Sequence, residues 1–168
     1  YALDLGSRGA KVVVNDLGGA VDGSGSGSTP ADEVVNEIIA NGGEAVANYD
    51  SVATKDGGES IVQTAIDNFG TVDAVVNNAG ILRDKSFANM SEEELSLIID
   101  VHLKGTFFVS QPAFKVMKEN AYGRIVNVAS PSGLFGNFGQ SNYGAAKMGI
   151  VGLTNVLAIE GAKYNIKV

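Results

Sequence analysis

A tyrosine and a lysine stand four positions apart in the segment SNYGAAK, as Tyr143 and Lys147. On a helix this spacing places the two side chains on one face. A free tyrosine has a pKa of about 10 and is a poor base near neutrality, and a neighbouring ammonium lowers that pKa. The pair can therefore act as a general acid and base where a hydride leaves or arrives. Ser130, at the end of an apolar run, can hydrogen-bond the reacting oxygen.

Two further polar groups follow apolar runs. Asp16 ends the run KVVVND, and in a dinucleotide-binding fold an acidic residue there accepts hydrogen bonds from the ribose hydroxyls. The segment NNAG, residues 77–80, ends another run, and its small residues leave room for a ligand close to the backbone. Taken singly, Asp16 could be a solvated acid, NNAG a simple turn and the tyrosine–lysine pair a solvated helix face. Their combination indicates one site.

The composition excludes several other kinds of site and partner. The chain has 168 residues, a formal net charge of −7, no cysteine and one histidine. The acidic balance argues against nucleic acid or an anionic membrane as a general partner. A disulfide, a zinc–thiolate site and a multi-histidine metal site are excluded, so we predict no metal. No apolar run approaches the roughly 20 residues of a membrane span, and residues 1–11 do not resemble a signal peptide, so we expect an intracellular protein.

Four apolar runs rich in β-branched residues predict strands, and their continuous apolar cores are typical of parallel strands covered on both faces. The runs are Lys11–Asp16, Glu44–Tyr49, Asp73–Asn78 and Gly123–Ser130. Helices are expected after a Thr29 cap, over the stripe Ile61–Phe69, after a capping box of Ser91 and Glu94, and from about Ser141 to Ala162. This alternation predicts an α/β fold: a Rossmann-type doubly wound parallel sheet in one NAD-binding domain, residues 1–168.

We expect this domain to be incomplete. Its first ten residues are typical of the second half of a helix that Gly9 ends, and NIKV of a strand just begun. The first strand, with its glycine fingerprint, is then expected before Tyr1, and a last strand and substrate loop after Val168. The glycine- and serine-rich segment Leu17–Ser28 follows the second strand of such a fold. We therefore predict a loop over the adenine side, with Leu17 at the cofactor, rather than the phosphate-binding loop.

Taken together and in this order, these residues resemble the short-chain dehydrogenase/reductase family over essentially the whole chain. The resemblance implies a nicotinamide-dependent oxidoreductase in which Tyr143 is the acid/base. It implies that Lys147 lowers the pKa of the tyrosine and binds the nicotinamide ribose, and that Ser130 positions the substrate oxygen. The further cofactor contacts that it implies are Asp50, Ser51 and Val52 at the adenine, and Asn78, Ala79 and Gly80 along the dinucleotide.

Within the family, the stretches VVVNDLGG, NNAGILRDKSF, VHLKG and GLFGNFGQSNY are similar to enzymes that act on (3R)-3-hydroxyacyl-CoA. These are the dehydrogenase unit of multifunctional enzyme type 2 and bacterial single-domain relatives. The resemblance implies oxidation to the 3-ketoacyl-CoA by NAD⁺, in the cytoplasm of a bacterium or the peroxisome of a eukaryote. His102 stands where most members carry a relay asparagine. In those members the asparagine completes a proton relay through a water molecule. His102 could hold the same water or carry a proton, or it could only pack and bond to a neighbouring carbonyl.

Individual residues bear on the choice of cofactor and of substrate. Asp16 favours NAD, because a carboxylate repels the 2′-phosphate of NADP and no arginine adjoins it. The family places substrate contacts between Ser130 and Tyr143, where aromatic and amide side chains suit an acyl chain and its thioester, unless they only shape the loop. These side chains are Phe135, Asn137, Phe138 and Gln140.

Alternative functions are a 3-ketoacyl reductase of fatty-acid synthesis, a hydroxysteroid dehydrogenase, and a non-catalytic NAD(H) sensor. The resemblance also implies a homodimer or homotetramer, formed through the helices that begin near Ser91 and Ser141.

Overall fold

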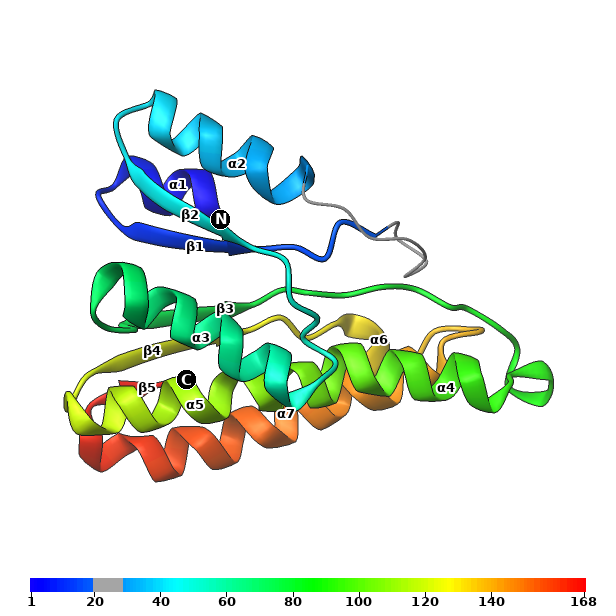
Figure 1. Ribbon diagram of the computed structural model, residues 1–168. Coiled ribbons are helices and arrows are strands. Elements are labelled where there is room, and N and C mark those ends of the chain that lie inside the picture. Colours follow the sequence, from blue (N-terminus) through cyan, green and yellow to red (C-terminus); the bar gives the residue numbers. More distant parts are fainter. Residues whose placement is uncertain (20–28) are drawn as a thin grey trace.

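A computed structural model describes residues 1–19 and 29–168 and shows strands alternating with helices (Figure 1). The strands are β1 (Lys11–Asn15), β2 (Glu44–Asn48), β3 (Ala74–Asn77), β4 (Gly123–Asn127) and β5 (Ile166–Lys167). The α-helices are α1 (Ala2–Ser7), α2 (Thr29–Ala40), α3 (Lys55–Phe69), α4 (Glu92–Ile98), α5 (Gly105–Glu119), α6 (Pro131–Phe135) and α7 (Ser141–Gly161). Shorter turns are the 3₁₀ segments η1 (Phe87–Asn89) and η3 (Ala162–Tyr164), and the π-helical η2 (Ile99–Lys104). The predicted α/β fold is confirmed.

All strand pairs are parallel, and they form two sheets, with the orders β1-β2 and β3-β4-β5. The register pairs Asn15 with Asn48 and Asn77 with Asn127, so each pair of strands ends at the same level. Figure 1 shows the loops after β1, β3 and β4 leaving the sheets on one side. The described residues supply no strand between β1 and β3, which is the place that the Rossmann order gives to its first strand. Residues 20–28 of the predicted loop Leu17–Ser28 lie outside the described residues.

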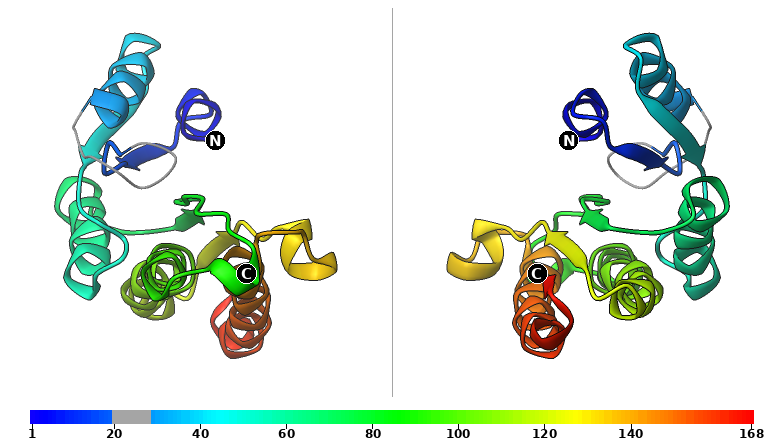
Figure 2. Two further views of the ribbon diagram at one scale, coloured as in Figure 1. Left: turned by 90° about the vertical axis from the view of Figure 1, so that its right-hand side faces the viewer. Right: turned by 90° about the vertical axis from the view of Figure 1, so that its left-hand side faces the viewer.

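Helix α3 connects the two sheets. It packs against β1 and β2 and, more extensively, against α5, which covers β3 and β4 (Figure 2). Val62 of α3 lies in the larger apolar core, which also holds Val72, Val109, Ala113, Met117, Ile125 and Ile166. A smaller core under α2 contains Val35, Ile38 and Ala45. No helix in the described part of the chain is both long and apolar enough to cross a membrane.

The long helical segment begins as predicted and then departs from regular geometry. Ser91 Oγ accepts a hydrogen bond from the Glu94 amide, and the Glu94 carboxylate accepts one from the Ser91 amide, which confirms the capping box. After α4 the backbone widens into the π-helical η2 and then continues as α5. Such π turns occur frequently at functional sites, and His102 lies in the middle of this one.

Candidate active site at the carboxyl ends of the strands

Ser130 lies just after β4 and caps the short helix α6. Its Oγ accepts a hydrogen bond from the Ser132 amide at 3.2 Å, and Pro131 occupies the first helical position. A hydroxyl has one proton to donate and two lone pairs. Because the cap uses only a lone pair, the Ser130 proton is available to an oxygen in front of the helix.

Two glycines bring α6 against α7. A Cβ built on Gly133 would lie 2.9 Å from the Met148 amide nitrogen, and one built on Gly144 would lie 3.0 Å from the Ser132 carbonyl oxygen. Only glycine allows backbones this close. The contact packs α6, which Ser130 caps, against the first turns of α7, which carry Tyr143 and Lys147.

Tyr143 and Lys147 share one face of α7, which confirms the predicted helix. Lys147 is buried, and its Nζ donates to the Val128 carbonyl oxygen at 2.6 Å, which ties α7 to the end of β4. Nζ lies 5.6 Å from the centre of the Tyr143 ring. Burial lowers the pKa of Lys147 from its usual value. The geometry gives the tyrosine a fixed cation at close range.

Asn142 holds the first turn of α7 in place, a role that sequence reasoning did not assign. Its side chain is fully buried and donates through Nδ2 to the Arg83 carbonyl oxygen at 2.9 Å and to the Glu94 carbonyl oxygen at 3.0 Å. Its Oδ1 accepts from the Tyr143 amide at 2.7 Å. The available signal was an amide side chain in the first helical turn, directly before the tyrosine.

His102 is buried between the loop after β3 and α7. Its Nε2 lies 2.8 Å from the Ile81 carbonyl oxygen and 3.1 Å from the Ile81 amide nitrogen, and its ring meets that of Tyr143 edge-on, with centroids 5.1 Å apart. Among the described residues, Nδ1 has no partner. Burial lowers the pKa of His102; the Ile81 hydrogen bond opposes this, and the Lys147 charge adds to it. The contact to a neighbouring carbonyl is therefore present, and a proton relay through His102 stays a prediction.

On the β1 side, Asp16 and Leu17 are exposed just after the strand. The Asp16 amide donates to the Asn48 carbonyl oxygen at 3.1 Å, and Asp16 Oδ1 accepts from the Gly18 amide at 2.6 Å. Leu17 is 43% exposed. This turn fixes one carboxylate oxygen of Asp16 and leaves the carboxylate at the surface, as a contact to ribose hydroxyls requires.

The segment after β2 contains Asp50, Ser51 and Val52. Asp50 is exposed, and its Oδ2 accepts from Asn48 Nδ2 at 3.0 Å and from Ser60 Oγ at 2.6 Å. Ser51 Oγ accepts from the Ala53 amide at 3.2 Å, which shapes the turn into α3. The Val52 side chain reaches η2 and α5, where a Cβ on Gly105 would lie 2.9 Å from Val52 Cγ2.

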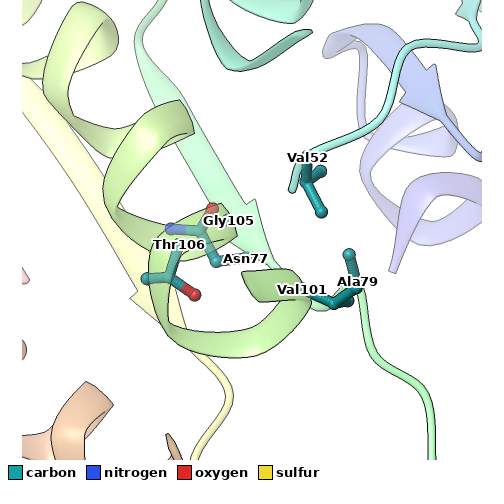
Figure 3. A pocket seen from close by; sticks show the side chains of 6 residues that line it. All are labelled: Val52, Asn77, Ala79, Val101, Gly105 and Thr106. Carbon is teal, nitrogen blue, oxygen red and sulfur yellow. The ribbon is translucent and has the colours of Figure 1, made fainter. Parts of the chain in front are cut away.

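Val52 and Ala79 approach each other across a small hollow at the end of β3 (Figure 3). Its other lining residues are Asn77, Val101, Gly105 and Thr106. The hollow holds about 10 Å³, enough for about one water molecule, so it is not itself a cofactor cleft. Asn78, Ala79 and Gly80 are exposed beside it. A Cβ on Gly80 would lie 2.5 Å from His102 Cε1, so this backbone cannot carry a side chain without displacing the histidine.

The residues predicted to contact substrate fall into two groups. Phe135, at the end of α6, and Phe138, in the loop between α6 and α7, are 85% and 90% exposed. The Gln140 amide is used within the protein: Nε2 donates to Asp84 Oδ2 at 2.8 Å, and Oε1 accepts from Ser132 Oγ at 2.8 Å and from Asn137 Nδ2 at 3.1 Å. Gln140 therefore joins this loop to the one after β3, Asn137 supports Gln140 from within the loop, and the two phenylalanines form an exposed apolar surface.

These residues fit a nicotinamide dinucleotide laid along the strand ends. Exposed carboxylates stand at one end, at Asp16 and Asp50, where hydroxyls and an amine would need acceptors. A buried ammonium, a tyrosine and a serine hydroxyl stand at the other, beside the open backbone of Ala79 and Gly80. Parallel α/β folds bind ligands at this edge. The fold and this arrangement of residues are typical of the dinucleotide-binding class of α/β proteins.

Residues 2–168 match the family described as short chain dehydrogenase, and the chain belongs to this family. A protein of Mycobacterium tuberculosis named as a short-chain type dehydrogenase/reductase is 61% identical over 166 residues, which are 99% of this chain and 58% of that protein. The peroxisomal multifunctional enzyme type 2 of Mus musculus is 58% identical over 166 residues, 99% of this chain and 22% of the enzyme. The predicted resemblance to the family and to multifunctional enzyme type 2 is thus confirmed.

Two further comparisons bear on fold and function. A crystal structure of a short chain dehydrogenase from Mycobacterium avium matches with a TM-score of 0.92 and 48% identity, covering 99% of this chain and 60% of that one. The 3-oxoacyl-[acyl-carrier-protein] reductase of Synechocystis is 42% identical over 167 residues, 99% of this chain and 64% of that protein. The chain spans less than two thirds of each of these proteins.

Proposed function

We propose that this chain is the dinucleotide-binding part of an NAD-dependent 3-hydroxyacyl-CoA dehydrogenase, which interconverts a (3R)-3-hydroxyacyl-CoA and the 3-ketoacyl-CoA. The observation that carries the proposal is the convergence of three groups at the end of β4. Ser130 presents its hydroxyl from the cap of α6, and Tyr143 stands in the first turn of α7. Lys147 is fixed beneath the tyrosine by the Val128 carbonyl oxygen.

Each of the three groups has a distinct part in the oxidation. The Ser130 hydroxyl donates a hydrogen bond to the substrate hydroxyl oxygen and so orients it. The Tyr143 phenolate takes the hydroxyl proton as the C–H bond breaks, and the C–O bond becomes a carbonyl. The nicotinamide of the cofactor supplies the hydride acceptor. Lys147 stabilises the phenolate electrostatically, and its own charge is maintained by the Val128 carbonyl. In the reverse reaction Tyr143 returns the proton.

NAD rather than NADP is supported by the β1 side of the site. The Asp16 carboxylate is held at the strand end by the Gly18 amide and stays exposed, where it suits two ribose hydroxyls and repels a 2′-phosphate. Leu17, Ser51, Val52, Asn78, Ala79 and Gly80 are proposed to line the same cofactor.

An acyl thioester is supported by the exposed apolar surface of Phe135 and Phe138 beside Ser130. The Mus musculus relative is a peroxisomal multifunctional enzyme by name, and the Synechocystis relative is a reductase of an acyl-carrier-protein substrate. A fatty-acid-synthesis reductase is therefore the second candidate, and a hydroxysteroid dehydrogenase is a third. For a eukaryotic source we propose the peroxisome, and for a bacterial one the cytoplasm.

The test is a substrate panel with the purified full-length protein. NADH formation is measured with the (3R) and (3S) forms of 3-hydroxybutyryl-CoA and of 3-hydroxydecanoyl-CoA, and with a hydroxysteroid. NADPH oxidation is measured with 3-ketoacyl-acyl-carrier-protein. The expected result is that turnover is fastest for the (3R)-3-hydroxyacyl-CoA with NAD, compared with every other combination of substrate and cofactor. Preference for NADPH with the carrier protein would instead establish the synthetic reductase. Tight NADH binding without turnover of any substrate would indicate a sensor.

A homo-oligomer is proposed on the exposed face of α7. Met148, Val156 and Ile159 are 49%, 51% and 79% exposed and form one stripe with Gly152, at a spacing of three or four residues. A large exposed apolar stripe on a helix is typical of a contact surface. A second copy of the chain is the occupant that the family resemblance implies.

A further inference from the structure

Strands β1 and β2 end in a pair of asparagines whose side-chain amides bond within the protein. Asn15 and Asn48 are partners in the strand register, and Asn15 Nδ2 donates to Asn48 Oδ1 at 2.8 Å. Asn48 is 7% exposed, and its Nδ2 donates to Thr64 Oγ1 on α3 and to Asp50 Oδ2, both at 3.0 Å. The Asn48 amide therefore joins β1, α3 and the segment after β2.

The same pair fixes Asp50, which is exposed. The Asp50 amide donates to Asn48 Oδ1 at 2.9 Å, and the Asp50 carbonyl oxygen accepts from Asn15 Nδ2 at 2.9 Å. Its carboxylate accepts from Asn48 Nδ2 and, at 2.6 Å, from Ser60 Oγ. Both carboxylate bonds end on Oδ2, and none of the described residues donates to Oδ1. A surface carboxylate is thus held in one orientation with one oxygen available.

This clamp is not a general consequence of pairing asparagines at a sheet end. Asn77 and Asn127 occupy the equivalent register at the end of β3 and β4, and Asn77 Nδ2 donates to Asn127 Oδ1 at 2.8 Å. Their remaining bonds go to Ser110 and Thr154 on the flanking helices, and no carboxylate is involved. A fixed acceptor loses less freedom when it binds a donor, so orienting Oδ1 in advance strengthens one particular hydrogen bond.

We propose that Asn15, Asn48 and Ser60 are positioning residues that orient the Asp50 carboxylate as the acceptor for the exocyclic amine of the cofactor's purine. They thereby make the site selective for a dinucleotide whose base carries an amine. The inference rests on the proposed function, because it takes the β1–β2 end as the adenosine end of the site.

The test compares reduced NAD with reduced nicotinamide hypoxanthine dinucleotide, which has a carbonyl in place of the amine. Dissociation constants are measured by fluorescence titration of the full-length protein and of the variants Asp50→Asn, Ser60→Ala and Asn48→Ala. Thr64→Val is the matched control, since it removes the other partner of Asn48 Nδ2 and leaves both donors to Asp50. One hydrogen bond to a carboxylate corresponds to about a tenfold preference for NADH in the wild type.

The expected result is that Asp50→Asn abolishes or reverses this preference and that Ser60→Ala reduces it to about threefold or less. Ser60→Ala should raise KM for NAD while kcat changes little. Thr64→Val should lower the melting temperature and keep the wild-type preference. Retention of the full preference in Ser60→Ala, or an equal loss in Thr64→Val, would overturn the positioning role and leave the proposed function standing. An unchanged preference in Asp50→Asn would also overturn it. A wild type that neither binds NADH nor turns over substrate would overturn the proposed function, and this inference with it.

Discussion

Two buried basic side chains lie close to the Tyr143 ring, and burial lowers the pKa of both. Lys147 and His102 each have a lowered pKa because the surrounding protein disfavours their charged forms. They differ in their partners: the Lys147 ammonium donates to the Val128 carbonyl oxygen, whereas His102 Nδ1 has no partner among the described residues. The arrangement suits a charged lysine beside a neutral histidine.

The histidine gives a prediction about pH. Above the ordinary His pKa of about 6.5, the folded and the unfolded states are both neutral at His102. As pH falls below 6.5, the unfolded chain binds a proton first because the folded pKa is lowered, so stability is lost down to the folded pKa and then levels off. The free energy of unfolding, measured by urea titration at pH values from 7.5 to 5, should therefore fall more steeply with decreasing pH in the wild type than in His102→Asn. The difference in slope should be at most about 1.4 kcal/mol per pH unit. Identical pH dependence in both proteins would contradict a buried neutral His102.

At this scale, part of the candidate site could be predicted from the sequence. The helix period places Tyr143 and Lys147 on one face, and the end of an apolar run places Ser130 just after a strand, because these are local properties of a helix and a strand. The bond from Lys147 to Val128 and the contact of His102 with Ile81 depend on how distant segments pack. The use of Gln140 to join two loops has the same origin.

At the scale of elements, the strands end within three residues of the predicted positions. Strand ends could be predicted because a local change from apolar residues to turn residues marks them. The π-helical turn η2 was not predicted, because the apolar period does not distinguish one wide turn from an α-helical one. Likewise, the approach of α6 to α7 depends on Gly133 and Gly144, and the sequence alone does not show that these two glycines lie at one helix contact.

A close contact between two helices gives a prediction about stability. A Cβ on Gly58 of α3 would lie 2.6 Å from the Phe108 backbone carbonyl of α5, and neither backbone can rotate away. Gly58→Ala should therefore destabilise the protein by about 1–3 kcal/mol, as overpacking does, although alanine favours a helix. Denaturant unfolding measures the change. The neighbouring Glu59→Ala loses only a surface ion pair with Lys55 and should stay within about 0.5 kcal/mol. Stability of Gly58→Ala equal to that of this control would contradict the packing of α3 on α5.

At the scale of the whole molecule, the stripe on α7 is proposed to hold two copies of the chain together. Ile159→Glu would place a charge in an apolar contact, which is costly to desolvate, and should convert the oligomer to monomers at micromolar concentration. Size-exclusion chromatography with light scattering gives the mass. Glu160→Lys, exposed next to the stripe, should leave the mass unchanged. An oligomer that survives Ile159→Glu would move the interface elsewhere.

In the proposed mechanism, the Tyr143 phenolate takes the proton of the substrate hydroxyl, at a position fixed by the strand ends and by helices α6 and α7. The most direct test is Tyr143→Phe in the full-length protein, with NADH formation from a (3R)-3-hydroxyacyl-CoA and the dissociation constant of NADH measured side by side. Loss of the acid/base group should lower kcat by about 10²–10⁴-fold. NADH binding should stay within about threefold, because one cofactor contact at most is removed. Activity above a few per cent of the wild type would contradict the account.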